Sequence, residues 1–298
     1  MEFSGIFPAL TTPFTAEGSV DAAGLQQNFS RYNQTGIAGY VVIGSTGESV
    51  MLSRSETETI LTAAQNAADS GKLMIAGTGA ESTAETIRRT KFAADLGYDA
   101  ALVKTPFYYK PAYKPEVLMR HYQAVADASP IPVLLYSVPI FTGVTLESSL
   151  VLELAGHPNI VGIKDSSGDI RRLGEIVAGP RTDFQVLTGS AAIVYPALTI
   201  GVRGGVLALA SALPEKCVAL YELAQRGEHE RARELHLKLV EASRLIVSEN
   251  GIAGVKYVMD LRGYVGGVPR LPIAPLHADA KRKIMDLIGQ LEPAALRA

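Results

Sequence analysis

Short apolar runs alternate with longer amphipathic segments along most of the chain. Runs rich in Val, Ile and Leu predict strands at residues 5–10, 39–44, 73–78, 100–106, 133–139, 160–164, 184–189 and 204–209. Apolar runs bounded by turn residues are typical of strands buried on both faces, as in a parallel sheet. Each run precedes a segment of helical period, and repeated strand-helix units imply right-handed crossovers. Eight such units predict an α/β fold, a closed (β/α)8 TIM barrel.

Two helix starts support this alternation. Residues 53–56 (Ser-Arg-Ser-Glu) and 82–85 (Ser-Thr-Ala-Glu) fit the capping box, in which a hydroxyl and a carboxylate satisfy free backbone amides. An open doubly wound sheet is the alternative architecture. No Gly-x-Gly-x-x-Gly motif follows an early strand, so a dinucleotide site has no support.

The strand signals stop at about residue 228. Beyond it, Ala232, Leu235, Leu239 and Ala242 form an apolar stripe at helical spacing, and residues 281–291 are amphipathic. We therefore predict a catalytic barrel over residues 1–227 and a C-terminal helical appendage over residues 228–298. The appendage would pack on the barrel or on a neighbouring subunit.

Composition narrows the class of protein. Of the 298 residues, 47% are hydrophobic and 19% are charged, which is typical of a globular chain. The net charge of -2 gives no electrostatic reason to expect nucleic acid or an anionic membrane as partner. The single cysteine, Cys217, excludes an intramolecular disulfide and a cysteine-based zinc cluster. A signal sequence and a membrane helix are both missing, so we expect a cytoplasmic protein.

The sixth apolar run leads directly into a lysine, Lys164. Because TIM-barrel active sites lie at the C-terminal ends of the strands, this lysine is a candidate for chemistry. Desolvation disfavours the ammonium form, and the free amine can attack a carbonyl carbon. Taken alone, a strand-end lysine that bends out to solvent is the alternative interpretation.

Other strand ends carry groups that suit the same chemistry. Residues 44–48 (Gly-Ser-Thr-Gly-Glu) offer hydroxyls and backbone amides that could hold a small carboxylate, or could simply form a capped turn. Tyr136 ends the fifth run, and residues 105–111 after the fourth run are rich in aromatic side chains. A phenol can transfer a proton when a hydroxyl hydrogen-bonds to it. Gly189 and the glycines before Val206 would let a ligand approach the backbone.

This combination favours imine chemistry on a keto acid. The lysine would condense with the ketone, a phenol would move protons, and hydroxyls would hold the carboxylate. The iminium nitrogen would act as the electron sink, so we predict neither a metal nor a cofactor. The five histidines are scattered, and neither His-x-His nor His-Glu-x-x-His occurs. The chain has no Gly-x-Ser-x-Gly elbow to support a hydrolase.

The motifs at residues 44–48, 136–139 (Tyr-Ser-Val-Pro) and 162–166 (Gly-Ile-Lys-Asp-Ser) also occur together in a known family. In their order and spacing the chain resembles the pyruvate-dependent class I aldolases, the dihydrodipicolinate synthase and N-acetylneuraminate lyase family. The resemblance covers residues 5–275. It implies that Lys164 forms a Schiff base with pyruvate and that Tyr136 is the main proton-transfer residue.

Further roles follow from the resemblance alone. It implies that Ser45 and Thr46 bind the carboxylate, and that Ser45 links Tyr136 to Tyr108. Ser166 would lie beside the Schiff base, and Gly189 and Val206 complete the expected substrate site. Family members are usually dimers of dimers in which the tyrosine matching Tyr108 reaches the neighbouring site, so a homotetramer is expected.

The subfamily depends on position 141. Dihydrodipicolinate synthases usually carry an arginine there, whereas this chain has Phe141, which cannot make a bidentate contact with a carboxylate. Residues 157–162, 164–169, 183–187 and 251–256 look more like 4-hydroxy-2-oxoglutarate aldolase. We therefore expect cleavage of 4-hydroxy-2-oxoglutarate to pyruvate and glyoxylate. The alternatives are dihydrodipicolinate synthase, which condenses pyruvate with aspartate semialdehyde, a 2-keto-3-deoxy sugar-acid aldolase or dehydratase, and a keto-acid sensor without activity.

Overall fold

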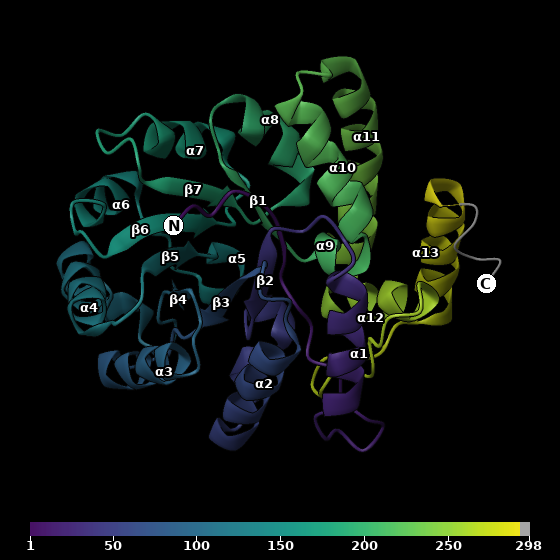
Figure 1. Ribbon diagram of the computed structural model, residues 1–298, viewed down its shortest axis with the longest axis horizontal. Coiled ribbons are helices and arrows are strands. Elements are labelled where there is room, and N and C mark those ends of the chain that lie inside the picture. Colours follow the sequence, from purple (N-terminus) through teal and green to yellow (C-terminus); the bar gives the residue numbers. More distant parts are fainter. Residues whose placement is uncertain (293–298) are drawn as a thin grey trace.

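Eight parallel strands form a single sheet in the computed structural model, which describes residues 1–292. They are β1 (Gly5–Pro8), β2 (Gly39–Val42), β3 (Leu73–Gly77), β4 (Ala100–Lys104), β5 (Val133–Ser137), β6 (Ile160–Asp165), β7 (Gln185–Thr188) and β8 (Gly204–Leu207). The strand order is β1-β8-β7-β6-β5-β4-β3-β2. A bridge between Ala9 and Val41 joins the two ends of this order, so the sheet closes into a barrel (Figure 1). The predicted TIM barrel is therefore confirmed.

Helices that follow the strands along the chain surround the barrel (Figure 1). They are α1 (Ala22–Tyr32), α2 (Arg54–Ala67), α3 (Thr83–Asp95), α4 (Pro115–Ala128), α5 (Pro139–Thr142), α6 (Ser148–Leu154), α7 (Ile170–Val177), α8 (Val194–Thr199), α9 (Leu209–Ala212) and α10 (Pro214–Gln225). The capping box predicted at the start of α2 is present. The Ser53 hydroxyl accepts a hydrogen bond from the Glu56 amide, and the Glu56 carboxylate accepts one from the Ser53 amide.

Most strands are shorter than the apolar runs that predicted them. The second run was expected to continue to residue 44, but β2 ends at Val42 because Ile43 adopts a left-handed backbone conformation with φ +59°. The sixth run differs in the opposite direction, since β6 continues one residue past Lys164. Lys164 therefore lies inside the sheet, paired in register with Tyr136 of β5 and Leu187 of β7.

Apolar side chains fill the barrel interior and the layer between sheet and helices. Buried residues inside the barrel include Phe7, Val41, Ile75, Leu102, Leu134, Leu187 and Val206. Layers of branched side chains are the usual filling of such a barrel, so its interior is a packed core and not a pore. A ligand therefore cannot enter the barrel interior, and active sites of this fold lie at the C-terminal ends of the strands.

The chain after α10 is helical, as predicted. It forms α11 (His229–Ala242), a π-helix (Ser243–Ser248), α12 (Gly251–Leu261) and α13 (Ala278–Leu291), all on one side of the barrel (Figure 1). Residues 293–298 of the predicted appendage lie outside the described residues. The division at residue 227 falls in the loop before α11, and as a domain boundary it stays a prediction.

Two further expectations concern the surface. His229 and His236 are seven residues apart on a helix with many charged residues, which predicts a solvated face for both. For His236 this prediction is wrong, because it is 8% exposed and its ring packs against Tyr195. Between residues 1 and 292, no helix has the length and apolar character needed to cross a membrane. The expected cytoplasmic location stays a prediction.

Candidate active site

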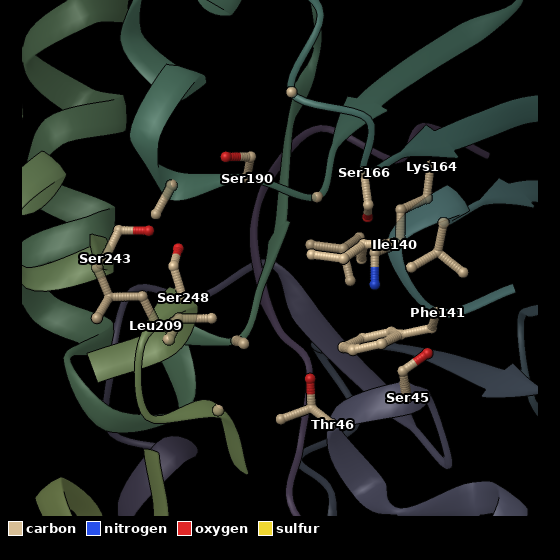
Figure 2. A pocket seen from close by; sticks show the side chains of 18 of the residues that line it. Ser45, Thr46, Ile140, Phe141, Lys164, Ser166, Ser190, Leu209, Ser243 and Ser248 are labelled. Carbon is tan, nitrogen blue, oxygen red and sulfur yellow. The ribbon is translucent and has the colours of Figure 1, made fainter. Parts of the chain in front are cut away.

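A cavity of about 410 Å³ opens at the C-terminal end of the barrel, between the strand ends and the helices that follow α10 (Figure 2). The sequence-predicted residues that line it are Ser45, Thr46, Tyr136, Lys164, Ser166, Gly189 and Val206. Phe141 of α5 also lines the cavity, at the position that the sequence analysis connected with specificity. Tyr108 does not line this cavity.

Lys164 is buried but faces the cavity. It is 3% exposed, and its Nζ lies 4.1 Å from the centroid of the Tyr136 ring. Side chains alternate between the two faces of a strand, so the next residue, Asp165, points away from the cavity. An amine held in this way is the only charged group among the cavity-lining residues that the structure describes.

An ion pair behind the strand holds the end of β6. Asp165 Oδ2 lies 2.8 Å from Arg172 Nε, and the two side chains are 0% and 5% exposed. Asp165 also accepts a hydrogen bond from the Ser167 amide, and Arg172 donates to the Leu146 carbonyl. Because the pair is fully enclosed and multiply hydrogen-bonded, it fixes the backbone that carries Lys164.

Gly189 brings the backbone of the β7 loop against the lysine. A Cβ atom at this position would overlap the Ser166 hydroxyl and would lie 3.2 Å from Lys164 Cε. The Gly189 amide also donates to the Asp165 carbonyl at 2.7 Å. No side chain fits here, so the Ser166 hydroxyl and Lys164 share one end of the cavity.

Tyr136 is the phenol beside the lysine. Its hydroxyl lies 3.3 Å from the Ser45 hydroxyl, as the family resemblance implied. Ser45 begins a short 3-10 turn, Ser45–Gly47, which lies between two residues with positive φ, Ile43 and Glu48. Positive φ is costly for a β-branched residue and persists only where surrounding contacts impose it. The turn that presents Ser45 and Thr46 therefore needs support from elsewhere.

Glu48 and Lys256 provide that support. Lys256 Nζ lies 2.7 Å from Glu48 Oε1, and the two side chains are 1% and 0% exposed. Glu48 also accepts a hydrogen bond from the Arg270 amide, and Lys256 donates to the Val268 carbonyl, each at 2.8 Å. Burial lowers the pKa of Lys256, while the hydrogen bond to Glu48 opposes the shift. Sequence reasoning missed this ion pair, because no local pattern around Glu48 or Lys256 identifies a partner so distant along the chain.

Tyr108 lies on the loop after β4 and is 72% exposed. Its amide donates to the Glu81 carboxylate at 2.9 Å, and its ring packs edge-on against Tyr109. Within residues 1–292 it makes no hydrogen bond to Ser45, so the expected Ser45 link to Tyr108 is not formed within one subunit. Its role in a neighbouring subunit stays a prediction.

Sequence reasoning also missed several lining residues on the far side of the cavity. Ser190 follows β7, and Ser243 and Ser248 are the first and last residues of the π-helix. An apolar helical stripe does not reveal that its flanking serines face a ligand cavity. Within residues 1–292, no group of three or more His, Cys, Asp or Glu side chains is arranged to hold a metal ion.

A buried lysine beside a phenol, at the C-terminal end of a TIM barrel, is the arrangement that class I aldolases require. The model of the dihydrodipicolinate synthetase family matches residues 2–291, and the chain belongs to that family. The chain is 36% identical over 293 residues to 4-hydroxy-tetrahydrodipicolinate synthase of Methanospirillum hungatei, covering 97% of this chain and 100% of that one. It is 39% identical over 277 residues to the enzyme of that name from Methanoculleus marisnigri, covering 92% and 94%.

A solved structure agrees with these relatives. The dihydrodipicolinate synthase of Acinetobacter baumannii, complexed with pyruvate, superimposes with a TM-score of 0.91 at 31% identity, covering 96% of this chain and 98% of that one. The prediction of an enzyme, a class I carbon-carbon lyase that works through a lysine Schiff base, is confirmed. The names of these relatives match the synthase alternative of the sequence analysis better than its first choice, the 4-hydroxy-2-oxoglutarate aldolase.

Proposed function

We propose that Lys164 forms the Schiff base with the 2-oxo group of pyruvate or of a 4-hydroxy-2-oxo acid. The observation that carries this proposal is the position of Lys164 Nζ, inside the cavity and 4.1 Å from the centroid of the Tyr136 ring. Ser45 and Thr46, which line the same cavity, bind the C1 carboxylate through their hydroxyls and the amides of their turn.

Cleavage then follows from the chemistry of the iminium. The Lys164 amine attacks C2 of the substrate, and loss of water leaves an iminium that withdraws electrons from C3. Tyr136 takes the proton of the C4 hydroxyl while the C3–C4 bond breaks, so the aldehyde leaves and an enamine remains. Protonation of the enamine at C3 and hydrolysis of the resulting iminium release pyruvate and regenerate the amine. Condensation is the same sequence reversed.

We propose 4-hydroxy-2-oxoglutarate as a substrate, cleaved to pyruvate and glyoxylate. In glyoxylate the carboxylate is bonded directly to the aldehyde carbon, so it would stay close to Lys164. The Ser166 hydroxyl is available there, since it has no hydrogen-bond partner within residues 1–292 and touches the Gly189 backbone. In aspartate semialdehyde the carboxylate is three bonds from the aldehyde carbon. It would reach toward Phe141, where the described lining offers no cation.

Condensation of pyruvate with aspartate semialdehyde is the second candidate, because the relatives carry the name of that synthase. Both reactions share the pyruvate half and the lysine. The two reactions differ in the group beyond C4 that the cavity must bind. The rates of both reactions, measured on one preparation, therefore show which one the enzyme favours.

The test measures pyruvate release from 4-hydroxy-2-oxoglutarate and condensation of pyruvate with aspartate semialdehyde, with Lys164→Arg as the inactive control. We expect kcat/KM for cleavage to exceed that for condensation by about 100-fold or more, because a buried carboxylate without a cation is strongly disfavoured. Faster condensation would establish the synthase instead. Borohydride reduction with pyruvate should label Lys164 in either case, and its failure would overturn the Schiff-base assignment itself.

We also propose that the enzyme is a homotetramer. The exposed aromatic pair Tyr108 and Tyr109 supports this, because large apolar rings gathered on a surface loop commonly mark a protein interface. Light scattering of the purified protein should give the mass of four subunits. The double variant Tyr108→Ala/Tyr109→Ala should give a smaller mass. An unchanged tetramer would move the interface elsewhere.

A further inference from the structure

A second, much smaller cavity of about 10 Å³ adjoins Ser45 and Tyr136, which also line the active-site cavity. Two more polar residues line it, Ser49 and Lys104, and the rest of the lining is glycine and apolar side chains. Its volume is close to the space that a single water molecule needs, and a buried water requires two to four polar partners. The small cavity therefore suits one ordered water.

The strand register brings Lys104 to this cavity. Lys104 is the last residue of β4 and is paired with Tyr136 of β5, which in turn is paired with Lys164 of β6. Side chains paired in this way point to the same face of the sheet, so the phenol lies between two lysines. Lys164 lines the active-site cavity, whereas Lys104 lines the small cavity.

The ammonium group of Lys104 has unused hydrogen-bond donors. Its side chain is only 11% exposed, and Nζ lies 3.8 Å from Glu81 Oε1, which is longer than a hydrogen bond. Nζ also lies 4.7 Å from the centroid of the Phe107 ring, which supplies no lone pair. A nearly buried ammonium without an acceptor is unfavourable. A water in the small cavity would provide the acceptor.

The surroundings of Lys104 favour loss of its proton. Burial lowers the pKa of Lys104, while the Glu81 charge opposes the shift and the Arg89 charge adds to it. The ring of His121 on α4 is close enough for the Lys104 charge to lower its pKa as well. A desolvated lysine can change between ammonium and amine, which a solvated lysine rarely does at neutral pH. The Glu81 side chain is 42% exposed and connects this group with the solvent.

We propose that Lys104 stores a proton for Tyr136, through Ser45 and one water in the small cavity. The Ser45 and Tyr136 hydroxyls already lie 3.3 Å apart. When Tyr136 donates its proton to the hydroxyl that leaves as water during iminium formation, its oxygen takes a proton from Ser45. Ser45 takes one from the water, and the water takes one from the Lys104 ammonium.

These transfers restore the phenol and leave Lys104 as a neutral amine. When Tyr136 later takes the proton of the C4 hydroxyl, the same transfers run in reverse, and Lys104 becomes an ammonium again. Within residues 1–292 Tyr108 makes no hydrogen bond to Ser45, so Lys104 gives the relay an end inside one subunit. This inference rests on the proposed Schiff-base function and extends it to the path of the proton.

Exchange of the pyruvate methyl protons with D2O, followed by NMR, isolates these transfers. It requires the Schiff base and proton transfer at C3, but no aldehyde. We expect Lys104→Met to slow both this exchange and kcat for cleavage by about tenfold or more, and to leave borohydride labelling of Lys164 unchanged. Lys72→Met is the control, because Lys72 precedes β3 at the other end of the barrel and donates to the Thr35 and Ile37 carbonyls. It should slow neither rate.

A second variant separates storage of a proton from the effect of charge alone. Lys104→Arg keeps a positive charge and donors for the water, but a guanidinium does not give up its proton. Its exchange should therefore be about as slow as that of Lys104→Met. Exchange at the wild-type rate in Lys104→Arg would overturn the storage of a proton. Because this variant keeps the charge, it also serves as the test if Lys104→Met does not fold.

Failure of the proposed function gives a different result. If the wild type is not labelled by pyruvate and borohydride and does not exchange the methyl protons, the Schiff-base assignment is wrong, and the role of Lys104 falls with it. If the wild type is labelled and exchanges these protons, and a labelled Lys104 variant exchanges them equally fast, only the role of Lys104 is wrong.

Discussion

The two halves of the active-site cavity are built in different ways. Lys164 and Tyr136 lie on neighbouring strands of one hydrogen-bonded sheet, and Ser45 and Thr46 lie on the turn after β2. Asp165 pairs with Arg172, and Glu48 pairs with Lys256, both in buried contacts. On the far side of the cavity, Ser190 comes from the loop after β7, and Ser243 and Ser248 come from the π-helix. Their hydroxyls make no hydrogen bond within residues 1–292.

The two halves of the cavity therefore differ in how firmly the positions of their side chains are fixed. Strands in a closed sheet cannot move independently, so the reacting groups keep their mutual distances. Helices added after the barrel can change without displacing these groups. The barrel therefore holds the reacting groups in place, while the C-terminal helices line the far side of the cavity.

The strongest test of the Lys164 half is removal of the amine. Lys164→Met should lower kcat by about 10⁴-fold or more and abolish borohydride labelling, because no iminium can form. Lys104→Met is the matched control for labelling. Lys104 also lies at a strand end, in register with Tyr136, and burial lowers its pKa, but it contacts Glu81 and does not line the main cavity. If borohydride labelling were lost in Lys104→Met and kept in Lys164→Met, Lys104 would be the lysine that forms the Schiff base.

Removal of the phenol should separate binding from proton transfer. Tyr136→Phe keeps the ring beside Lys164 Nζ and removes the hydroxyl that contacts Ser45. We expect kcat for cleavage to fall by about 10²-fold to 10⁴-fold, the usual range for a general acid-base group. Pyruvate should still be trapped on Lys164 by borohydride. A variant that retains kcat would assign the proton transfer to another group.

Removal of one partner of the ion pair between Glu48 and Lys256 tests whether this pair supports the turn that carries Ser45 and Thr46. Lys256→Met leaves a buried carboxylate without its partner and should lower the free energy of unfolding by about 3–5 kcal/mol. The Michaelis constant for pyruvate should also rise, since Glu48 ends the turn that carries Ser45 and Thr46. Urea denaturation and steady-state kinetics measure the two effects.

A double variant serves as the control for this pair. Glu48→Gln with Lys256→Met removes both charges, and it should recover much of the lost stability. If the single variant is as stable as the wild type, the pair does not support the turn.

The sequence was sufficient for features that depend on local pattern. The alternation of apolar runs and amphipathic segments predicted the barrel, and the rule that active sites lie at strand ends led to Lys164 and Tyr136. Features that depend on contacts between distant positions could not be predicted in this way. Glu48 and Lys256 meet only because α12 packs beside the β2 loop, and no periodicity encodes that contact.

Irregular backbone conformations could not be predicted from the sequence either. Ile43 was assigned to a strand because its side chain favours one, but tertiary contacts impose a positive φ on it. The π-helix likewise reads as an ordinary apolar helical segment, although its extra width brings Ser243 and Ser248 to the cavity. Local propensity fails at both places, and both lie next to the active site, where such conflicts are expected.

The smallest expected effect concerns the outer support of the barrel, at His121 on α4. Burial, followed by the nearby charge of Lys104, lowers the pKa of His121 to about 4, and its Nδ1 contacts the Thr83 hydroxyl at 2.9 Å. Between pH 6.5 and 4 the unfolded chain binds a proton at this histidine that the folded protein does not. Stability should therefore decrease as the pH falls through that window, by about 2 kcal/mol at pH 5.

Comparison of the wild type with His121→Gln isolates this contribution. Urea denaturation at pH 7 and pH 5 should show a smaller loss of stability in the variant, because glutamine does not titrate. The ratio of kcat/KM for cleavage of 4-hydroxy-2-oxoglutarate to that for condensation of pyruvate with aspartate semialdehyde should be the same in both proteins at pH 7, since His121 does not line the cavity. An identical loss of stability in both would assign the acid sensitivity to another group, whereas a changed ratio would show that the barrel wall also selects the aldehyde.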